Sequence, residues 1–206
     1  METVMNGLLP GYRVNEYRLV IVPHRDLWEK MMKIKEAFAA TYLDDSTRLG
    51  RPYLTIASFS QYAMMEQRIL GRLREVAMGH YPFKVEIKNF GSFPAHTIYF
   101  DVVSRVPVQA LIKSVRSQAQ RIMKLNEEHK PFFPASPHLT LASRLKPWQY
   151  EKGWEEFRHR NFSGRFVAAS MSVLRRAAGE EKFRAIADFE FQNLPVSIRQ
   201  GELFNW

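Results

Sequence analysis

The sequence Pro-Tyr-Leu-Thr-Ile-Ala-Ser at residues 52–58 recurs 85 residues later as Pro-His-Leu-Thr-Leu-Ala-Ser at residues 137–143, and five of the seven positions are identical. In each copy a proline ends a loop, and the residues after it alternate in a way that predicts a β-strand. The repeat therefore predicts two related strands at the centre of two related halves. We expect these two strands to face each other across a cleft.

The first and third residues after each proline share one face of the predicted strand. That face carries His138 and Thr140 in the second copy, and Tyr53 and Thr55 in the first. Two histidines facing one cleft suit phosphodiester chemistry, because a neutral imidazole can take a proton while a protonated one supplies the leaving oxygen. A threonine hydroxyl beside an imidazole can donate to a phosphate oxygen. The second copy is a complete half-site of this kind, whereas the first has a phenol in place of the imidazole.

The hydrophobic pattern around the repeat predicts a mixture of strands and helices. Alternating apolar residues predict strands at residues 17–22, 53–59, 83–88, 97–103, 138–143, 166–174 and 183–191. Apolar stripes at helical spacing predict helices at residues 28–41, 63–78, 108–125 and 147–160. Each half thus holds strand, helix and hairpin around one copy of the repeat, which predicts an α+β fold of two lobes related by a pseudo-twofold axis.

We expect residues 1–206 to form a single bilobal domain, because neither lobe looks able to fold alone. The two lobes would be interleaved, one around residues 52–58 and the other around residues 137–143, with a boundary between residues 104 and 125. The C-terminal tail, residues 193–206, carries Leu203, Phe204 and Trp206 and is expected to dock on the lobes or on a partner.

Composition limits the classes of chemistry that this chain can perform. The 206 residues are 46% hydrophobic, enough for a sizeable core, and include no cysteine, which excludes disulfides and thiol nucleophiles. The net charge of +9 suits a polyanionic partner such as nucleic acid. No apolar stretch approaches the ~20 residues that cross a bilayer, and the first residues do not follow a secretory signal pattern. We therefore expect a cytoplasmic protein without a membrane partner.

With these motifs the chain resembles the two-histidine (2H) phosphoesterase superfamily, in the branch of 2'-5' RNA ligases and RNA 2',3'-cyclic phosphodiesterases. The resemblance extends over about residues 17–192. The His-Leu-Thr-Leu sequence at 138–141 fits completely, and Phe-Gly-Ser-Phe at 90–93 with the strand after it resembles the family's glycine-phenylalanine hairpin. Residues 172–174 and 182–186 resemble its closing hairpin.

The resemblance implies a bilobal α+β fold in which two antiparallel sheets flank a central groove and the helices lie outside. It also implies hydrolysis, or reversible ligation, of 2',3'-cyclic or 2'-5' phosphodiesters without a cofactor or a metal. The partner would be RNA or a small nucleotide. The oligomeric state does not follow from the sequence.

The family's motif transfers to His138 and Thr140 as a matched half-site and to Thr55 as a matched hydroxyl, while Tyr53 departs from it. A phenol is only about one part in a thousand ionised at neutral pH, so Tyr53 is a poor base, although it can donate a hydrogen bond. Losing one acid–base partner lowers a rate by about 10²- to 10⁴-fold. We therefore count Tyr53 in the catalytic set and expect weakened turnover.

Three interpretations of the altered first motif remain open. His138 and Tyr53 could act as an unequal pair, or the groove could bind nucleotides or RNA without turnover, or His24 or His96 could replace the missing histidine.

Arg51 and Arg144 adjoin the motifs and are the candidates for substrate binding, since arginine suits bidentate contact with phosphate. Arg144 would share a face with His138 if the strand continued that far. Candidate residues for stacking on a base are Tyr12, Tyr17, Phe93 and Phe133, and no single one can be chosen from the sequence.

Overall fold

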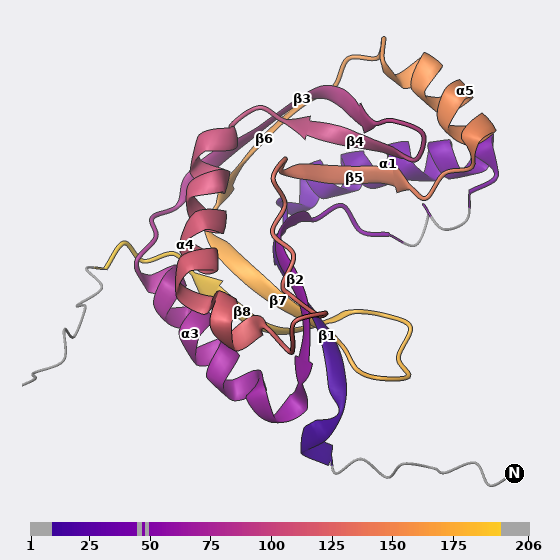
Figure 1. Cartoon of the computed structure of the whole chain (residues 1–206). Coiled ribbons are helices and arrows are strands. Elements are labelled where there is room, and N and C mark those ends of the chain that lie inside the picture. The colour runs from indigo at the N-terminus through magenta and orange to yellow at the C-terminus, as the bar shows by residue number, and fades with distance from the viewer. Residues whose placement is uncertain (1–9, 45–46, 48–49, 195–206) are drawn as a thin grey trace, which may run out of the picture.

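A computed structural model describes residues 10–44, 47 and 50–194 of the chain (Figure 1). Its strands are β1 (Val14–Ile21), β2 (Leu54–Tyr62), β3 (Phe83–Phe93), β4 (Thr97–Val102), β5 (His138–Ser143), β6 (Ser163–Ala168), β7 (Ser170–Arg176) and β8 (Arg184–Glu190). Its helices are α1 (Arg25–Tyr42), α3 (Glu66–Met78), α4 (Arg105–Met123) and α5 (Pro147–Phe157), with 3-10 turns η1 (Pro10–Tyr12) and η2 (Ala63–Met65).

The strands form one antiparallel sheet in the order β6-β3-β4-β5-β2-β1-β7-β8. The two repeat strands, β5 and β2, are neighbours at its centre, and a single residue pair, Leu54 with Leu139, joins them. The sheet therefore consists of two four-stranded halves. The predicted α+β fold is confirmed, with one correction: the repeat strands pair edge to edge instead of facing each other across a cleft.

The helices cover the two halves separately (Figure 1). Helices α1 and α5 pack on the half that contains β4, β5 and β6, while α3 and α4 pack together on β8 and β2. The apolar stripe predicted for α4 is confirmed, since Val108, Leu111, Ile112, Val115 and Ala119 are buried. Each buried aliphatic side chain of this size contributes about 1.5–3 kcal/mol, so this face holds α4 on the sheet.

The segment predicted as one strand at residues 166–174 is two strands in the structure. β6 ends at Ala168 and pairs with β3 at one edge of the sheet, whereas β7 begins at Ser170 and pairs with β1 in the other half. The buried residues lie at even positions up to Ala168 and at odd positions from Met171 to Val173. This change of parity reverses the face that the chain buries, as expected where a strand ends and another begins.

The last strand also departs from its predicted alternation. β7 and β8 pair Val173 with Ala187 and then Leu174 with Ala185, so Ile186 is an extra residue in β8. This bulge reverses the faces, and Phe189 is buried whereas Ala185, four residues before it in the alternating pattern, is exposed.

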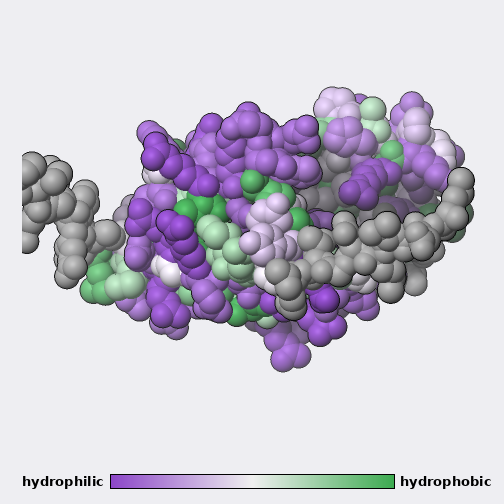
Figure 2. All heavy atoms as spheres, turned by 60° about the horizontal axis from the view of Figure 1, so that its bottom comes forward, coloured by the Kyte–Doolittle hydropathy of each residue, from purple (hydrophilic) through white to green (hydrophobic). Residues whose placement is uncertain are grey.

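The surface of the described part of the chain is mainly polar. The face drawn in Figure 2 is largely hydrophilic, with hydrophobic side chains gathered in patches between the polar ones. No helix within residues 10–44 and 50–194 is both long enough and apolar enough to cross a membrane. Of the predicted tail, Asn193 and Leu194 donate backbone hydrogen bonds of 2.8 Å to the carbonyls of His80 and Met78, and residues 195–206 lie outside the described residues.

Candidate functional site

The two copies of the repeat lie side by side in opposite directions. Leu54 and Leu139 are fully buried opposite each other. Continuing this antiparallel register places Tyr53 level with Thr140 and Thr55 level with His138. These four side chains are half-buried on the other face of the sheet. The structure thus brings the predicted catalytic residues of both motifs to one surface.

A β-bulge occupies the same position in both copies. In β2 the extra residue is Ile56, because Leu19 pairs with Ala57 and Val20 with Thr55. In β5 the extra residue is Leu141, because Ile98 pairs with Ala142 and Tyr99 with Thr140. Each bulge keeps two successive apolar residues buried and moves the serine after them, Ser58 or Ser143, to the polar face. The repeated Ile-Ala-Ser and Leu-Ala-Ser sequences are thereby explained.

Two pockets follow this polar face. A pocket of about 160 Å³, here called the Tyr53 pocket, is lined by Arg18, Lys35, Thr47, Gly50, Arg51, Tyr53, Thr55 and residues 140–143. A pocket of about 210 Å³, the His138 pocket, is lined by Arg18, Thr55, Ser58, Phe132, Pro134 and His138. Arg18 and Thr55 belong to both, so the two pockets form one continuous motif groove.

The imidazole of His138 is held in one orientation. Its Nδ1 lies 2.8 Å from the carbonyl oxygen of Ser136, so Nδ1–H donates there and Nε2 keeps its lone pair. The ring packs against Tyr99 at 4.8 Å and Phe93 at 5.0 Å between centroids. Burial lowers the pKa of His138, opposed by the Ser136 carbonyl and by Asp101. The imidazole of His138 is therefore mainly neutral at pH 7.

The ring of Tyr99 reaches His138 because a glycine lies beneath it. Gly91 in β3 pairs with Tyr99 in β4. A Cβ atom at Gly91 would lie 2.4 Å from the Tyr99 ring, closer than any side chain allows. The glycine of the predicted Phe-Gly-Ser-Phe hairpin thus lets Tyr99 lie across β3 and support the imidazole.

Arg18, which the sequence analysis missed, is the central cation of the groove. Arg18 is on β1, opposite Ser58 of β2, and it lines both pockets. Desolvation by the surrounding walls, followed by the charge of Arg176, lowers the pKa of Arg18, but a guanidinium stays protonated at neutral pH. No ion pair joins Arg18 to a carboxylate among the residues described. Its only sequence signal is a charged residue within the otherwise apolar segment 17–22.

The two predicted substrate-binding arginines have different positions. Arg51 lines the Tyr53 pocket. Arg144 lies just after the end of β5 with φ 59°, so the strand does not continue to Arg144 and the condition for it to share a face with His138 is not met. Arg144 lines neither pocket of the groove, but its charge contributes to the lowered pKa of Arg18. Both arginines therefore add positive potential at the Tyr53 end of the groove.

Lys35 is a second residue that the sequence analysis missed. It lies on α1, is 2% exposed, and its Nζ donates to the carbonyl of Thr140 at 3.2 Å and to that of Leu141. These carbonyls flank the bulge in β5, where the strand pairing is interrupted. Burial lowers the pKa of Lys35 to about 8, opposed by Asp44. A lysine at a core position of a helix gives no sequence signal that distinguishes it from a surface lysine.

Lys35 should make stability depend on pH in the alkaline range. Between pH 8 and 10.5 the unfolded chain binds a proton at this lysine that the folded chain does not, so stability rises with pH. Relative to Lys35→Met, we expect the wild-type free energy of unfolding to gain up to about 3 kcal/mol over this range. Urea unfolding of both proteins at pH 7.5, 9 and 10.5 measures the difference. Parallel curves for the two proteins would contradict the assignment.

The histidines considered as replacements have other partners. The Nδ1 of His24 accepts from the backbone N–H of Leu27 at 3.1 Å and caps α1. The ring of His96 lies 2.6 Å from the hydroxyl of Thr97 in the β3–β4 turn. Neither histidine is among the residues that line the motif groove.

The paired half-sites and the two-lobed antiparallel sheet define a phosphoesterase-like class of protein. A family model described as the 2'-5' RNA ligase superfamily matches residues 23–180, and the chain belongs to that superfamily. The matched residues include both copies of the repeat.

Solved structures show the same fold at low sequence identity. E. coli LigT complexed with 3'-AMP has a TM-score of 0.59 at 14% identity, over 86% of this chain and 98% of that one. E. coli LigT complexed with ATP has a TM-score of 0.55 at 15% identity, with the same coverage of both chains. The protein TT0787 of Thermus thermophilus has a TM-score of 0.53 at 15% identity over 86% and 98%. No curated protein matches the chain by sequence.

Proposed function

We propose that this protein is a phosphoesterase acting on 2',3'-cyclic or 2'-5' phosphodiesters of RNA or nucleotides by acid–base chemistry. The observation that carries the proposal is the orientation of His138, whose Nε2 is free while Nδ1 donates to Ser136. This imidazole shares its pocket with Arg18 and with Thr55 of the first motif. A base, a cation and a hydroxyl donor thus line one small pocket.

The phosphate would lie between the arginines and the two threonines of the motif groove. Nε2 of His138 takes a proton from a water as the water oxygen attacks phosphorus, and the bond from phosphorus to one ribose oxygen breaks. The leaving oxygen takes a proton from the Tyr53 hydroxyl or from solvent. Thr55, Thr140 and Arg51 stabilise the charge on the non-bridging oxygens. Ligation follows the same path with a ribose hydroxyl in place of water: its oxygen attacks phosphorus, His138 takes its proton, and the bond from phosphorus to one ribose oxygen of the cyclic phosphate breaks.

The family supports this proposal, and so do the ligands of its relatives. LigT, which has the same fold, has been crystallised with 3'-AMP, with NADP+ and with ATP. The net charge of +9 favours a phosphate-bearing partner. We propose a cytoplasmic location for the protein and an RNA or small nucleotide as its substrate.

A second function is favoured by Tyr53 itself. A phenol in place of the first imidazole leaves the arginines and threonines able to bind phosphate but removes one proton-transfer group. The alternative is therefore a nucleotide- or RNA-binding protein of the same fold without turnover.

Hydrolysis of the four 2',3'-cyclic mononucleotides and of an oligonucleotide ending in a cyclic phosphate tests the two functions. We expect slow, saturable conversion to monophosphates, slower by about 10²- to 10⁴-fold than a site with two histidines would give. Thermal stabilisation by the same nucleotides is measured in parallel. Stabilisation without conversion would support the binding protein. The absence of both stabilisation and conversion would refute both functions.

A further inference from the structure

An exposed aromatic side chain is fixed beside the motif groove. Phe132 is 61% exposed, which is unusual for a phenylalanine. Its backbone N–H donates to the carbonyl of Ser58 at 2.8 Å, and its carbonyl accepts from the N–H of Ser58 at 3.0 Å. This two-bond bridge to β2 holds the residue in place without using its side chain. The ring is therefore presented to solvent at a defined position.

The ring of Phe132 lies where two pockets meet. It lines the His138 pocket together with Arg18 and Ser58. The same three residues also line a neighbouring pocket of about 340 Å³, here called the Phe132 pocket. The other residues lining it are Glu16, Tyr17, Phe59, Ser60, Glu128, His129, Lys130 and Phe183. The motif groove thus continues past His138 into a larger pocket.

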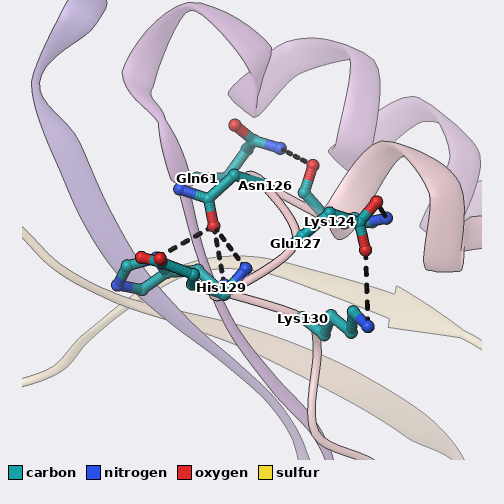
Figure 3. A network of polar contacts seen from close by, with 7 residues as sticks. Gln61, Lys124, Asn126, Glu127, His129 and Lys130 are labelled. Carbon is teal, nitrogen blue, oxygen red and sulfur yellow. Dashed lines mark hydrogen bonds and ion pairs between the residues drawn. The ribbon is translucent and has the colours of Figure 1, made fainter.

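The wall of the Phe132 pocket is formed by a loop that is already ordered (Figure 3). Oδ1 of Asn126 accepts from the backbone N–H groups of Glu128 at 3.1 Å and His129 at 2.7 Å. Gln61 on β2 donates to the carbonyls of Ile122 at 3.1 Å and Lys124 at 3.0 Å, which fixes the start of the loop to the sheet. A ligand entering this pocket would not have to order the loop first.

Two ion pairs also stabilise the same loop. Glu127 pairs with Lys124 and, at 3.3 Å, with Lys130 (Figure 3). Within the pocket, Glu16 is likewise paired with Arg176 at 2.5 Å. Glu16 and Lys130 of this pocket are thus paired within the protein, whereas no ion pair joins Arg18 or Arg51 to a carboxylate among the residues described.

The chemistry of the surface therefore changes along its length. The Tyr53 end offers Arg18, Arg51 and two threonine hydroxyls, which suit a phosphate. The other end offers the rings of Phe132 and Phe183, with serine, glutamate and histidine among the other residues that line it, and this combination suits a nucleobase. A nucleoside phosphate has the same order of groups.

Phe132 is the aromatic ring that is free to stack. The ring of Phe183 already lies 4.3 Å from the Arg18 guanidinium and 4.9 Å from that of Arg176. Among the described residues, Phe132 takes part in none of the aromatic or cation contacts found elsewhere in the molecule. Its neighbour Phe133, a candidate for stacking from the sequence, is half-buried and lies beneath Arg116 at 5.9 Å.

We propose that the Phe132 pocket binds the nucleobase of the nucleotide whose phosphate occupies the motif groove, with the base stacked on the ring of Phe132. The phosphate position in this inference rests on the proposed function. The base position rests on the fixed ring, the size of the pocket and its ordered wall.

Binding titrations with Phe132→Ala and Phe132→Tyr test the proposal by calorimetry. The ligands are adenosine 3'-monophosphate and ribose 5-phosphate, which has no base. We expect Phe132→Ala to weaken binding of the adenosine nucleotide about 5- to 100-fold, in line with stacking on an aromatic side chain, and Phe132→Tyr to bind it within about threefold of wild type. Binding of ribose phosphate should be the same in all three proteins.

Two results would overturn the base pocket. One is an unchanged affinity of Phe132→Ala for the nucleotide, and the other is an equal loss for both ligands. Since the ring is exposed and only its backbone is bonded, the alanine variant should fold, and its circular dichroism spectrum checks this. The binding assay does not depend on turnover. If the affinity differences are found but no hydrolysis is detected, only the enzymatic part of the proposed function is refuted.

Discussion

His138→Ala should lower kcat/KM for a 2',3'-cyclic nucleotide by about 10²- to 10⁴-fold, the largest loss expected of any single substitution in this protein. The imidazole is the proposed base, and its Nδ1–H already donates to the Ser136 carbonyl. Only Nε2 can accept the proton of the attacking water. No other imidazole lines the motif groove among the residues described.

The protonation of His138 should also set how kcat/KM of the wild-type protein depends on pH. Burial lowers the pKa of His138, so the neutral form persists to lower pH than in a free histidine. If His138 is the base, kcat/KM should rise with pH to a plateau, with the midpoint of the rise below the ordinary pKa of histidine. If His138 were the acid, the rate would instead fall over that same interval. The profile therefore assigns the direction of proton transfer.

A matched control for this substitution is His96→Ala, which makes the same change in charge and size. His96 is an exposed histidine of the β3–β4 turn, and its ring contacts the hydroxyl of Thr97. This variant should keep activity within about twofold, because His96 does not line the motif groove. A loss in His96→Ala as large as that in His138→Ala would point to His96 as the missing catalytic histidine. An active His138→Ala protein would refute the proposed role of the base.

The fold could be predicted from the sequence because the repeat and the amphipathic stripes are both local patterns. β5 begins and ends at the predicted residues, His138 and Ser143. The pairing of β2 with β5 could not be predicted in the same way. It depends on which strand edges meet in three dimensions, and alternation within a strand carries no information about its neighbour.

Bulges account for further differences between pattern and structure. An extra residue at Ile56 and at Leu141 leaves the seven-residue repeat intact but changes which side chain faces the groove. Perfect alternation would have placed Ala57 there, and the structure places Ser58. A bulge is defined by two strands together, so one strand read alone cannot reveal it.

The two missed cations show the same limit for the candidate site. Arg18 and Lys35 lie on the first strand and the first helix, far in sequence from either motif, yet both line the Tyr53 pocket. Motif spacing identified the groups that could move protons. It could not identify the groups that the fold brings to them, because those are set by the packing of α1 and β1 against the repeat strands.

Tyr53→His should raise kcat/KM by up to about 10²-fold, because it supplies the acid–base partner that the first motif lacks. The position is suitable, since Tyr53 lies level with Thr140 and lines the groove beside Thr55. Tyr53→Phe is the matched control. If the phenol now donates to the phosphate or to the leaving oxygen, Tyr53→Phe should lose about tenfold or more.

The gain from Tyr53→His should depend on pH in a way that the wild type does not. Tyr53 lies close enough to Arg18 for their charges to interact, so Arg18 would lower the pKa of an imidazole placed there. Two neutral imidazoles cannot serve as acid and base, and the new one must be protonated while His138 stays neutral. The gain should therefore be largest below pH 7 and disappear toward pH 8, giving a bell-shaped profile. A folded Tyr53→His protein with the wild-type rate from pH 5.5 to 8 would show that the first motif does not limit the reaction.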